Sequence, residues 1–129
     1  MAQYSRNAIY SRLYTAINAA YTNAYITSSY EISPPQFPAV FIREIGSVQN
    51  TNAVTFSVDD DQYQSTYEVQ IFCDKQMTAY QIMSIVQAEM RAMFYIEDMI
   101  QPVENLDKTI YRLVARFHRT IGGGEEMPT

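Results

Sequence analysis

The sequence predicts an α+β fold: a mainly antiparallel sheet of three to five strands, antiparallel throughout or mixed, with an N-terminal helix and a second helix packed on it. Two segments repeat apolar residues every three or four positions, as helices do, and three segments have the alternation or composition of strands. A chain of 129 residues has the length of one domain. We therefore expect a single domain over residues 1–122, with a long exposed loop at about 46–64, for which a projecting hairpin is the alternative, and a flexible tail at 123–129.

The first helix is predicted over residues 2 to about 27. Apolar residues recur there at spacings of three and four, namely Ile9, Leu13, Ile17, Ala20 and Ala24. On the same helix, Tyr10, Tyr14, Tyr21 and Tyr25 would form a second stripe. Two interpretations of this stripe stay open. It packs within the chain with its hydroxyls at the rim, or it forms a subunit contact, because tyrosine offers a large contact area with a polar tip.

The prolines of "SPPQFP" at 33–38 end any helix, and the strand-like segments 39–45 and 65–74 follow. The second helix comes next, with one apolar face made of Ala79, Ile82, Met83, Val86, Met90 and Met93. Residues 96–108 contain Pro102 and a mild turn signal, so we predict a loop there. The last strand is predicted over residues 109–121, where the sequence alternates with a period of two.

In that last strand Arg112, Arg116 and His118 fall on one face, opposite Leu113, Ala115 and Phe117. One interpretation is cross-strand pairing with Glu68 and Glu44, which lie on polar faces of other predicted strands. A second is a subunit contact, and a third is nucleic-acid binding. Three charges would neutralise only a few phosphates, and the chain carries a net charge of -5, so we expect weak affinity for nucleic acid.

Side chains that support catalysis or metal binding are sparse. The chain has one histidine, one cysteine and no glycine-rich phosphate loop. The run Asp59, Asp60, Asp61 lacks the alternate spacing, the glycine and the distal glutamate of a calcium loop. No stretch approaches the roughly 18 apolar residues of a membrane span. We therefore expect no catalytic, cofactor-binding or metal-binding residues, no cofactor, no enzymatic activity and no membrane partner.

The order of the elements and three sequence segments resemble a known family. The segments are "FPAV" at 37–40, "YEVQIFCDK" at 67–75 with the helix after it, and "YRLVARFHRTI" at 111–121. Over residues 5–122 the chain resembles the tail terminator, or tail completion, proteins of long-tailed bacteriophages, which are also called minor capsid or head-tail joining proteins. The loop at 46–64 has no counterpart in this pattern.

The resemblance implies a structural virion protein. Its members form a ring, generally of six subunits, that stops tail-tube polymerisation and joins the tube to the head connector. The implied partners are other copies of the chain, the tail tube protein and the head-closure or connector protein, with DNA passing through the lumen without specific binding. The implied location is the head-proximal end of the virion tail, with the host cytoplasm as the place of assembly.

A ring needs two different contact faces on each subunit. The tyrosine stripe and the face of Arg112, Arg116 and His118 are the candidates, and the loop with Asp59, Asp60 and Asp61 is a candidate contact to the next ring. Two alternatives stay open. One is a head-closure or neck adaptor protein, and the other is a small nucleic-acid-binding or hydrolytic protein centred on the same two arginines and the histidine.

Overall fold

The computed structural model describes residues 6–29, 36–49, 62–104 and 109–122. Two helices and five strands follow one another as α1 (Arg6–Ala20), β1 (Tyr25–Thr27), β2 (Ala39–Gln49), β3 (Gln62–Cys73), α2 (Gln76–Ala92), β4 (Ile96–Val103) and β5 (Tyr111–Gly122). The strands form one sheet in the order β1-β2-β3-β5-β4. Only the β1–β2 pair is parallel. The predicted α+β class, with a mixed sheet, is confirmed.

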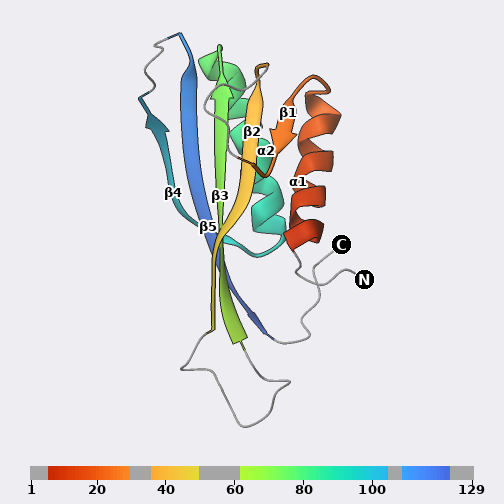
Figure 1. Ribbon diagram of the computed structural model, residues 1–129, viewed down its shortest axis with the longest axis vertical. Coiled ribbons are helices and arrows are strands. Elements are labelled where there is room, and N and C mark those ends of the chain that lie inside the picture. The colour runs from red at the N-terminus through yellow and green to blue at the C-terminus, as the bar shows by residue number, and fades with distance from the viewer. Residues whose placement is uncertain (1–5, 30–35, 50–61, 105–108, 123–129) are drawn as a thin grey trace.

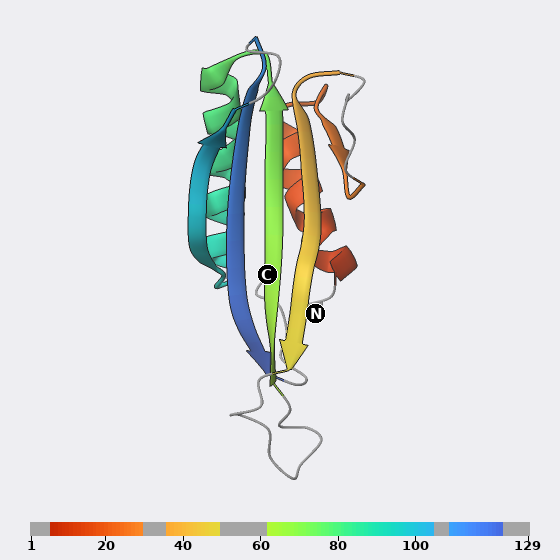
Figure 2. The same ribbon diagram turned by 60° about the vertical axis from the view of Figure 1, so that its left-hand side comes forward.

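Both helices lie on the same side of the sheet (Figure 1). Figure 2 shows the other side in front, with the strands uncovered by any described helix. We call these sides the helix face and the open face. The core lies between the helices and the helix face, and its large buried side chains include Ile9, Leu13, Ile17, Ile42, Ile71, Ile82, Met83, Met90, Leu113 and Phe117.

The second helix forms as its apolar spacing predicts. All six residues of the predicted face, Ala79 to Met93, are buried. The helix ends at Ala92, and the next turn closes with the Met93 amide bonding to the carbonyls of Glu89 and Met90. Phe94 then takes a left-handed backbone with a φ of 65°. Glycine is the usual residue there, because a Cβ in this conformation costs about 1 to 2 kcal/mol.

The first helix is shorter than predicted. It stops at Ala20, and Tyr25 belongs to β1, where it pairs with Ala39 of β2. The Tyr25 amide bonds to the carbonyl of Pro38 at 2.9 Å. The segment "YIT" consists of residues that favour strands, and the available edge of β2 gives it hydrogen bonds that a longer helix would forgo. The predicted helical stripe of four tyrosines is therefore wrong at Tyr21, which follows the end of α1, and at Tyr25, which lies in β1.

The predicted loop at 96–108 is also wrong over residues 96–103, which form the edge strand β4. A bulge between Glu97 and Met99 interrupts its pairing with β5, and Pro102 lies further along. The bulge shifts the alternation of side chains between the two faces, and proline is itself uncommon in strands. The sequence of β4 therefore lacks the period of two that indicates a strand. Prolines within sheets lie on edge strands, where the missing amide leaves no partner unpaired.

The strands β2 and β3 continue into the predicted exposed loop. Residues 46–49 belong to β2 and residues 62–64 to β3, so the expectation of a loop is wrong at both ends. A bulge lies between Glu44 and Gly46. Val48 and Tyr63 are the only apolar residues in 46–49 and 62–64, too few to show the alternation that marks a half-buried strand. Figure 1 shows β2, β3 and β5 extending beyond the helices. Residues 59–61 lie outside the described residues.

Candidate functional site

The middle of the open face carries a buried carboxylate between two arginines. In the sheet register, Arg43 of β2 and Arg116 of β5 both pair with Glu68 of β3, so the three side chains lie in one row. Arg43 Nη2 lies 3.1 Å from Glu68 Oε1, and Arg116 Nε lies 3.0 Å from Oε2. Glu68 is 3% exposed, while half of each arginine side chain is exposed. The predicted pairing of Glu68 with the last strand is confirmed.

A second row of polar side chains adjoins the first. Gln70 Nε2 donates to Glu68 Oε1 at 2.7 Å, and Gln70 Oε1 accepts hydrogen bonds from Arg112 Nη2 at 2.9 Å and Arg112 Nε at 3.3 Å. The Arg112 guanidinium also lies 5.3 Å above the ring of Phe72. Glu68 and Gln70 therefore hold the arginine side chains in place through hydrogen bonds before any partner binds.

The aromatic end of the open face continues from Arg112. Phe72 and Phe41 meet edge to face, with ring centroids 5.4 Å apart. They form a small buried cluster with Ala39, and Tyr25, Phe37 and Ile110 pack against it. The open face thus carries aromatic side chains at one end and ordered arginines in the middle.

The electrostatics of Glu68 follow from its neighbours. Burial alone would raise the pKa of this carboxyl, but hydrogen bonds from Gln70, Arg116 and Arg43 outweigh it, and the pKa lies below its ordinary value. Glu68 is therefore charged at neutral pH. Its oxygens are occupied by donors, so the group positions arginines and does not serve as a free base.

His118 lies on the same face, nearer the end of β5. Its Nδ1 is in hydrogen-bond contact with Asp98 Oδ1 on the bulge of β4. Thr66 and Ile96 hold the paired positions on either side. The structure brings Arg112, Arg116 and His118 to one face as predicted, but each of the three is bonded to a different group.

Glu44 is the predicted pairing residue that the structure contradicts. Its strand, β2, is separated from β5 by β3. Glu44 pairs in register with Tyr67 and accepts a hydrogen bond from Ser65 Oγ at 3.3 Å. The strand order places β2 beside β3, and the register of that pair aligns Arg43 and not Glu44 with Glu68. The sequence shows neither the order nor the register.

The four tyrosines are distributed over different environments. The Tyr10 hydroxyl donates to the Ile26 carbonyl at 3.2 Å, and the Tyr21 hydroxyl donates to Gln81 Oε1 at 2.6 Å. Burial, and to a smaller extent Tyr14, raises the pKa of Tyr10. Tyr14 is 42% exposed, and its ring lies 6.2 Å from that of Tyr10. Tyr10 and Tyr21 therefore make contacts within the chain, and a subunit contact through Tyr10, Tyr14, Tyr21 and Tyr25 stays a prediction.

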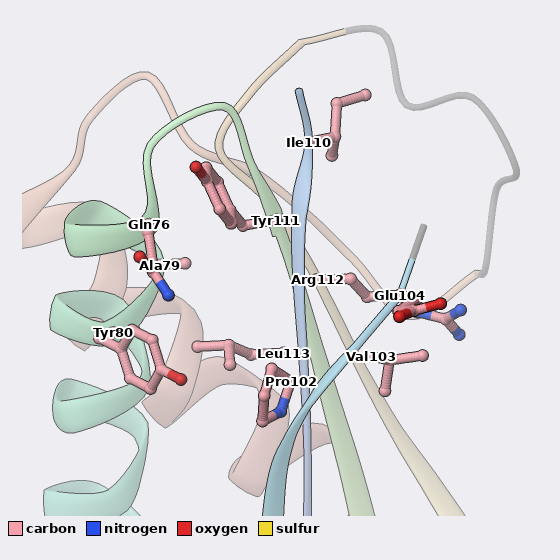
Figure 3. Close-up of a pocket in the computed structure, with 10 residues that line it drawn as sticks. All are labelled: Gln76, Ala79, Tyr80, Pro102, Val103, Glu104, Ile110, Tyr111, Arg112 and Leu113. Atoms are coloured by element: carbon pink, nitrogen blue, oxygen red, sulfur yellow. The ribbon is translucent and has the colours of Figure 1, made fainter. Parts of the chain in front are cut away.

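A pocket of about 360 Å³ opens between the start of α2 and the strands β4 and β5 (Figure 3). Tyr80 and Tyr111 stand on one side of it, Leu113 and Pro102 line its floor, and Ile110 and Glu104 lie on the far side. Sequence reasoning missed this pocket, because its lining comes from three separate segments. The one sequence feature that could have indicated the pocket is Tyr111, an aromatic residue at the end of a strand.

Within the described ranges, no group of three or more His, Cys, Asp and Glu side chains is placed to hold a metal ion.

Neither α1 nor α2, the helices of the described part of the chain, is long and apolar enough to cross a membrane.

Comparisons with known proteins give structural likenesses and no match in sequence. No protein-family model matches the chain, and no curated protein matches it. Among solved structures, the chain is similar to the sheath/tube terminator of an extracellular contractile injection system, PVC, in its extended state. The TM-score is 0.48 at 12% identity, and the match covers 100% of this chain and 62% of the other.

Proposed function

We propose that this protein is a structural subunit of a phage tail, a tail terminator whose copies form a ring that caps the tail tube. The observation that carries the proposal is the open face of the sheet. It combines the partly exposed aromatic side chains of Tyr25 and Phe37, which pack over the buried cluster of Phe41 and Phe72, with arginines that are already held by Glu68 and Gln70. Arginine and aromatic residues are enriched in protein interfaces, and fixed side chains lose little entropy when a partner binds.

The arginines suit a protein partner better than DNA. Arg43 and Arg116 share the charge of Glu68, which leaves two unbalanced positive charges for the three arginines of the network. The whole chain has a net charge of -5. Affinity for phosphates grows with the number of contacts that a protein makes, so this face provides little of it. DNA passing through such a ring would not be held.

The long strands also support an assembly role. The ends of β2, β3 and β5 extend beyond the helices as an arm that offers contact area away from the core (Figure 1). The resemblance of residues 5–122 to tail terminators gives the partners: the tail tube protein below the ring and the connector above it.

Electron microscopy of particles made without the protein tests the proposal. A terminator limits tube growth, so we expect tails of excessive and variable length, and we expect rings when the purified protein is added to tail tubes. A neck adaptor would give tails of normal length that fail to join heads. Tails of normal length, already joined to heads, would refute both roles.

An electrophoretic mobility assay addresses the nucleic-acid alternative. We expect no shift of double- or single-stranded DNA at physiological salt with up to micromolar protein. A tight complex that disappears in the triple variant Arg112→Ala, Arg116→Ala, His118→Ala would favour the nucleic-acid role instead.

A further inference from the structure

We infer that neighbouring subunits meet through an aromatic knob and a pocket at opposite ends of α2, with Phe94 of one copy entering the pocket beside Tyr80 and Tyr111 of the next. The inference deepens the proposed ring and rests on it. The occupant of the pocket is a second copy of this chain.

The pocket has the shape and chemistry for an aromatic side chain. Its volume is about 360 Å³, and Ala79, Leu113 and Pro102 contribute apolar walls. Tyr80 and Tyr111 are 40% and 41% exposed, so two aromatic rings are left partly uncovered (Figure 3). Aromatic pairs prefer the edge-to-face or offset contacts that a ring entering between them would make.

The knob is an exposed aromatic residue held outward. Phe94 is 61% exposed and follows α2 in a left-handed backbone, where glycine would be the ordinary residue. The Arg119 guanidinium lies 5.4 Å from the centre of the Phe94 ring, and Arg119 Nη1 donates to the Phe94 carbonyl at 3.4 Å. Ile96, two residues later, is also 61% exposed. The fold therefore presents a rigid apolar projection.

The two ends also carry opposite charges. Arg91 is exposed in the last turn of α2, next to the knob, and Glu104 is exposed at the rim of the pocket. Each is outside the ion pairs formed among the described residues. A copy that inserts its knob brings Arg91 toward the Glu104 side of its neighbour, which adds orientation to the contact.

The separation of knob and pocket favours a ring. The 17 residues of α2 span about 25 Å, so the two surfaces lie at opposite ends of the element. A contact between different surfaces runs head to tail from copy to copy, and it closes into a ring when the rotation allows.

The variant Phe94→Gly provides the main test. Glycine accepts the left-handed backbone, so the monomer should keep or improve its melting temperature. We expect at least a tenfold weaker self-association, measured by sedimentation velocity of the protein alone and by electron microscopy of the protein on tail tubes. The control is Thr15→Ala, a truncation at an exposed position of α1 away from both surfaces, which should associate normally.

Mixing two variants tests the direction of the contact. Phe94→Gly keeps the pocket and Tyr111→Ser keeps the knob, so each alone should be monomeric, while an equal mixture should form dimers and nothing larger. A charge exchange adds a second readout: Arg91→Glu and Glu104→Arg should each weaken association, and the double variant should restore it.

The results of these experiments distinguish a failure of the knob contact from a failure of the proposed terminator function. Wild-type-like rings of Phe94→Gly would overturn the knob while leaving the terminator role intact. A wild-type protein that forms only closed dimers would keep the knob contact and overturn the ring. A wild-type protein that stays monomeric both alone and on tail tubes would overturn both.

Discussion

At the scale of single residues, Glu68 shows how a carboxylate can be buried on the uncovered side of a sheet. A charge taken out of water is costly unless partners satisfy it, and here two guanidinium groups and one amide do so. The period of two in β5 was enough to place Arg116 on the face for which cross-strand pairing with Glu68 or Glu44 was one interpretation. The part played by Arg43 depends on the strand order, which local sequence does not encode.

We expect Glu68→Gln to lower the free energy of unfolding by roughly 1.5 to 3 kcal/mol, because the hydrogen bonds to a charged acceptor are lost while the two arginines keep their mutual repulsion. Urea denaturation measures this change. The control is Glu97→Gln, an exposed carboxylate that accepts one hydrogen bond from Gln87, for which the change should stay within about 0.5 kcal/mol. Equal effects would show that the row of Arg43, Glu68 and Arg116 adds no stability.

The same residue predicts a dependence on pH. The folded pKa of Glu68 lies below its ordinary value of 4.5, so ionised Glu68 stabilises the fold above that value. The contribution is lost as the pH falls through the folded pKa. We expect the stability difference between wild type and Glu68→Gln to be constant from pH 7 to about pH 5 and to shrink below about pH 4.5. A difference that grows on acidification would contradict the lowered pKa.

At the scale of elements, the helices could be predicted better than the edges of the sheet. Every apolar position predicted for α2 is buried, because an amphipathic spacing of 3.6 residues is a local property. The strands β1 and β4 were missed for a shared reason. Each lies at an edge, is short or interrupted by a bulge, and owes its conformation to hydrogen bonds with a neighbour that is distant in sequence.

The tyrosines of α1 offer a matched pair of variants. Tyr10→Phe removes the hydroxyl that bonds to the Ile26 carbonyl and joins α1 to β1. We expect the free energy of unfolding to fall by about 0.5 to 1.5 kcal/mol. We also expect faster amide hydrogen exchange in Tyr25–Thr27. Tyr14→Phe removes a hydroxyl from the more exposed ring and should change neither the free energy of unfolding nor the exchange rates. Equal exchange in the two variants would mean that the Tyr10 hydroxyl does not hold β1 in place.

At the scale of the whole molecule, the division into two faces organises both fold and function. Alternation in β3 and β5 was sufficient to predict which side chains enter the core, such as Val69, Ile71, Leu113 and Phe117. The candidate site was only partly predictable. Arg112, Arg116 and His118 were placed on one face, but the aromatic cluster of Phe41 and Phe72 requires β2 and β3 to be neighbours.

A pair of threonines tests whether the open face contacts a partner. Thr120 is exposed on β5 in the same alternating set as Arg116 and His118, and Thr15 is exposed on α1. We expect Thr120→Arg to weaken ring formation on tail tubes at least tenfold, because a long charged side chain blocks close approach. Thr15→Arg should assemble normally. Electron microscopy measures assembly, thermal melting shows whether each monomer stays folded, and normal rings of Thr120→Arg would remove this end of the open face from the interface.

The edge strand β4 has a consequence for the protein before assembly. A free strand edge invites other chains to add strands, which leads to aggregation. Here the bulge at Asp98, the charges of Glu97 and Asp98, and the missing amide of Pro102 each obstruct such an addition. We expect that concentrated subunits do not aggregate through the β4 edge while they wait for their binding site.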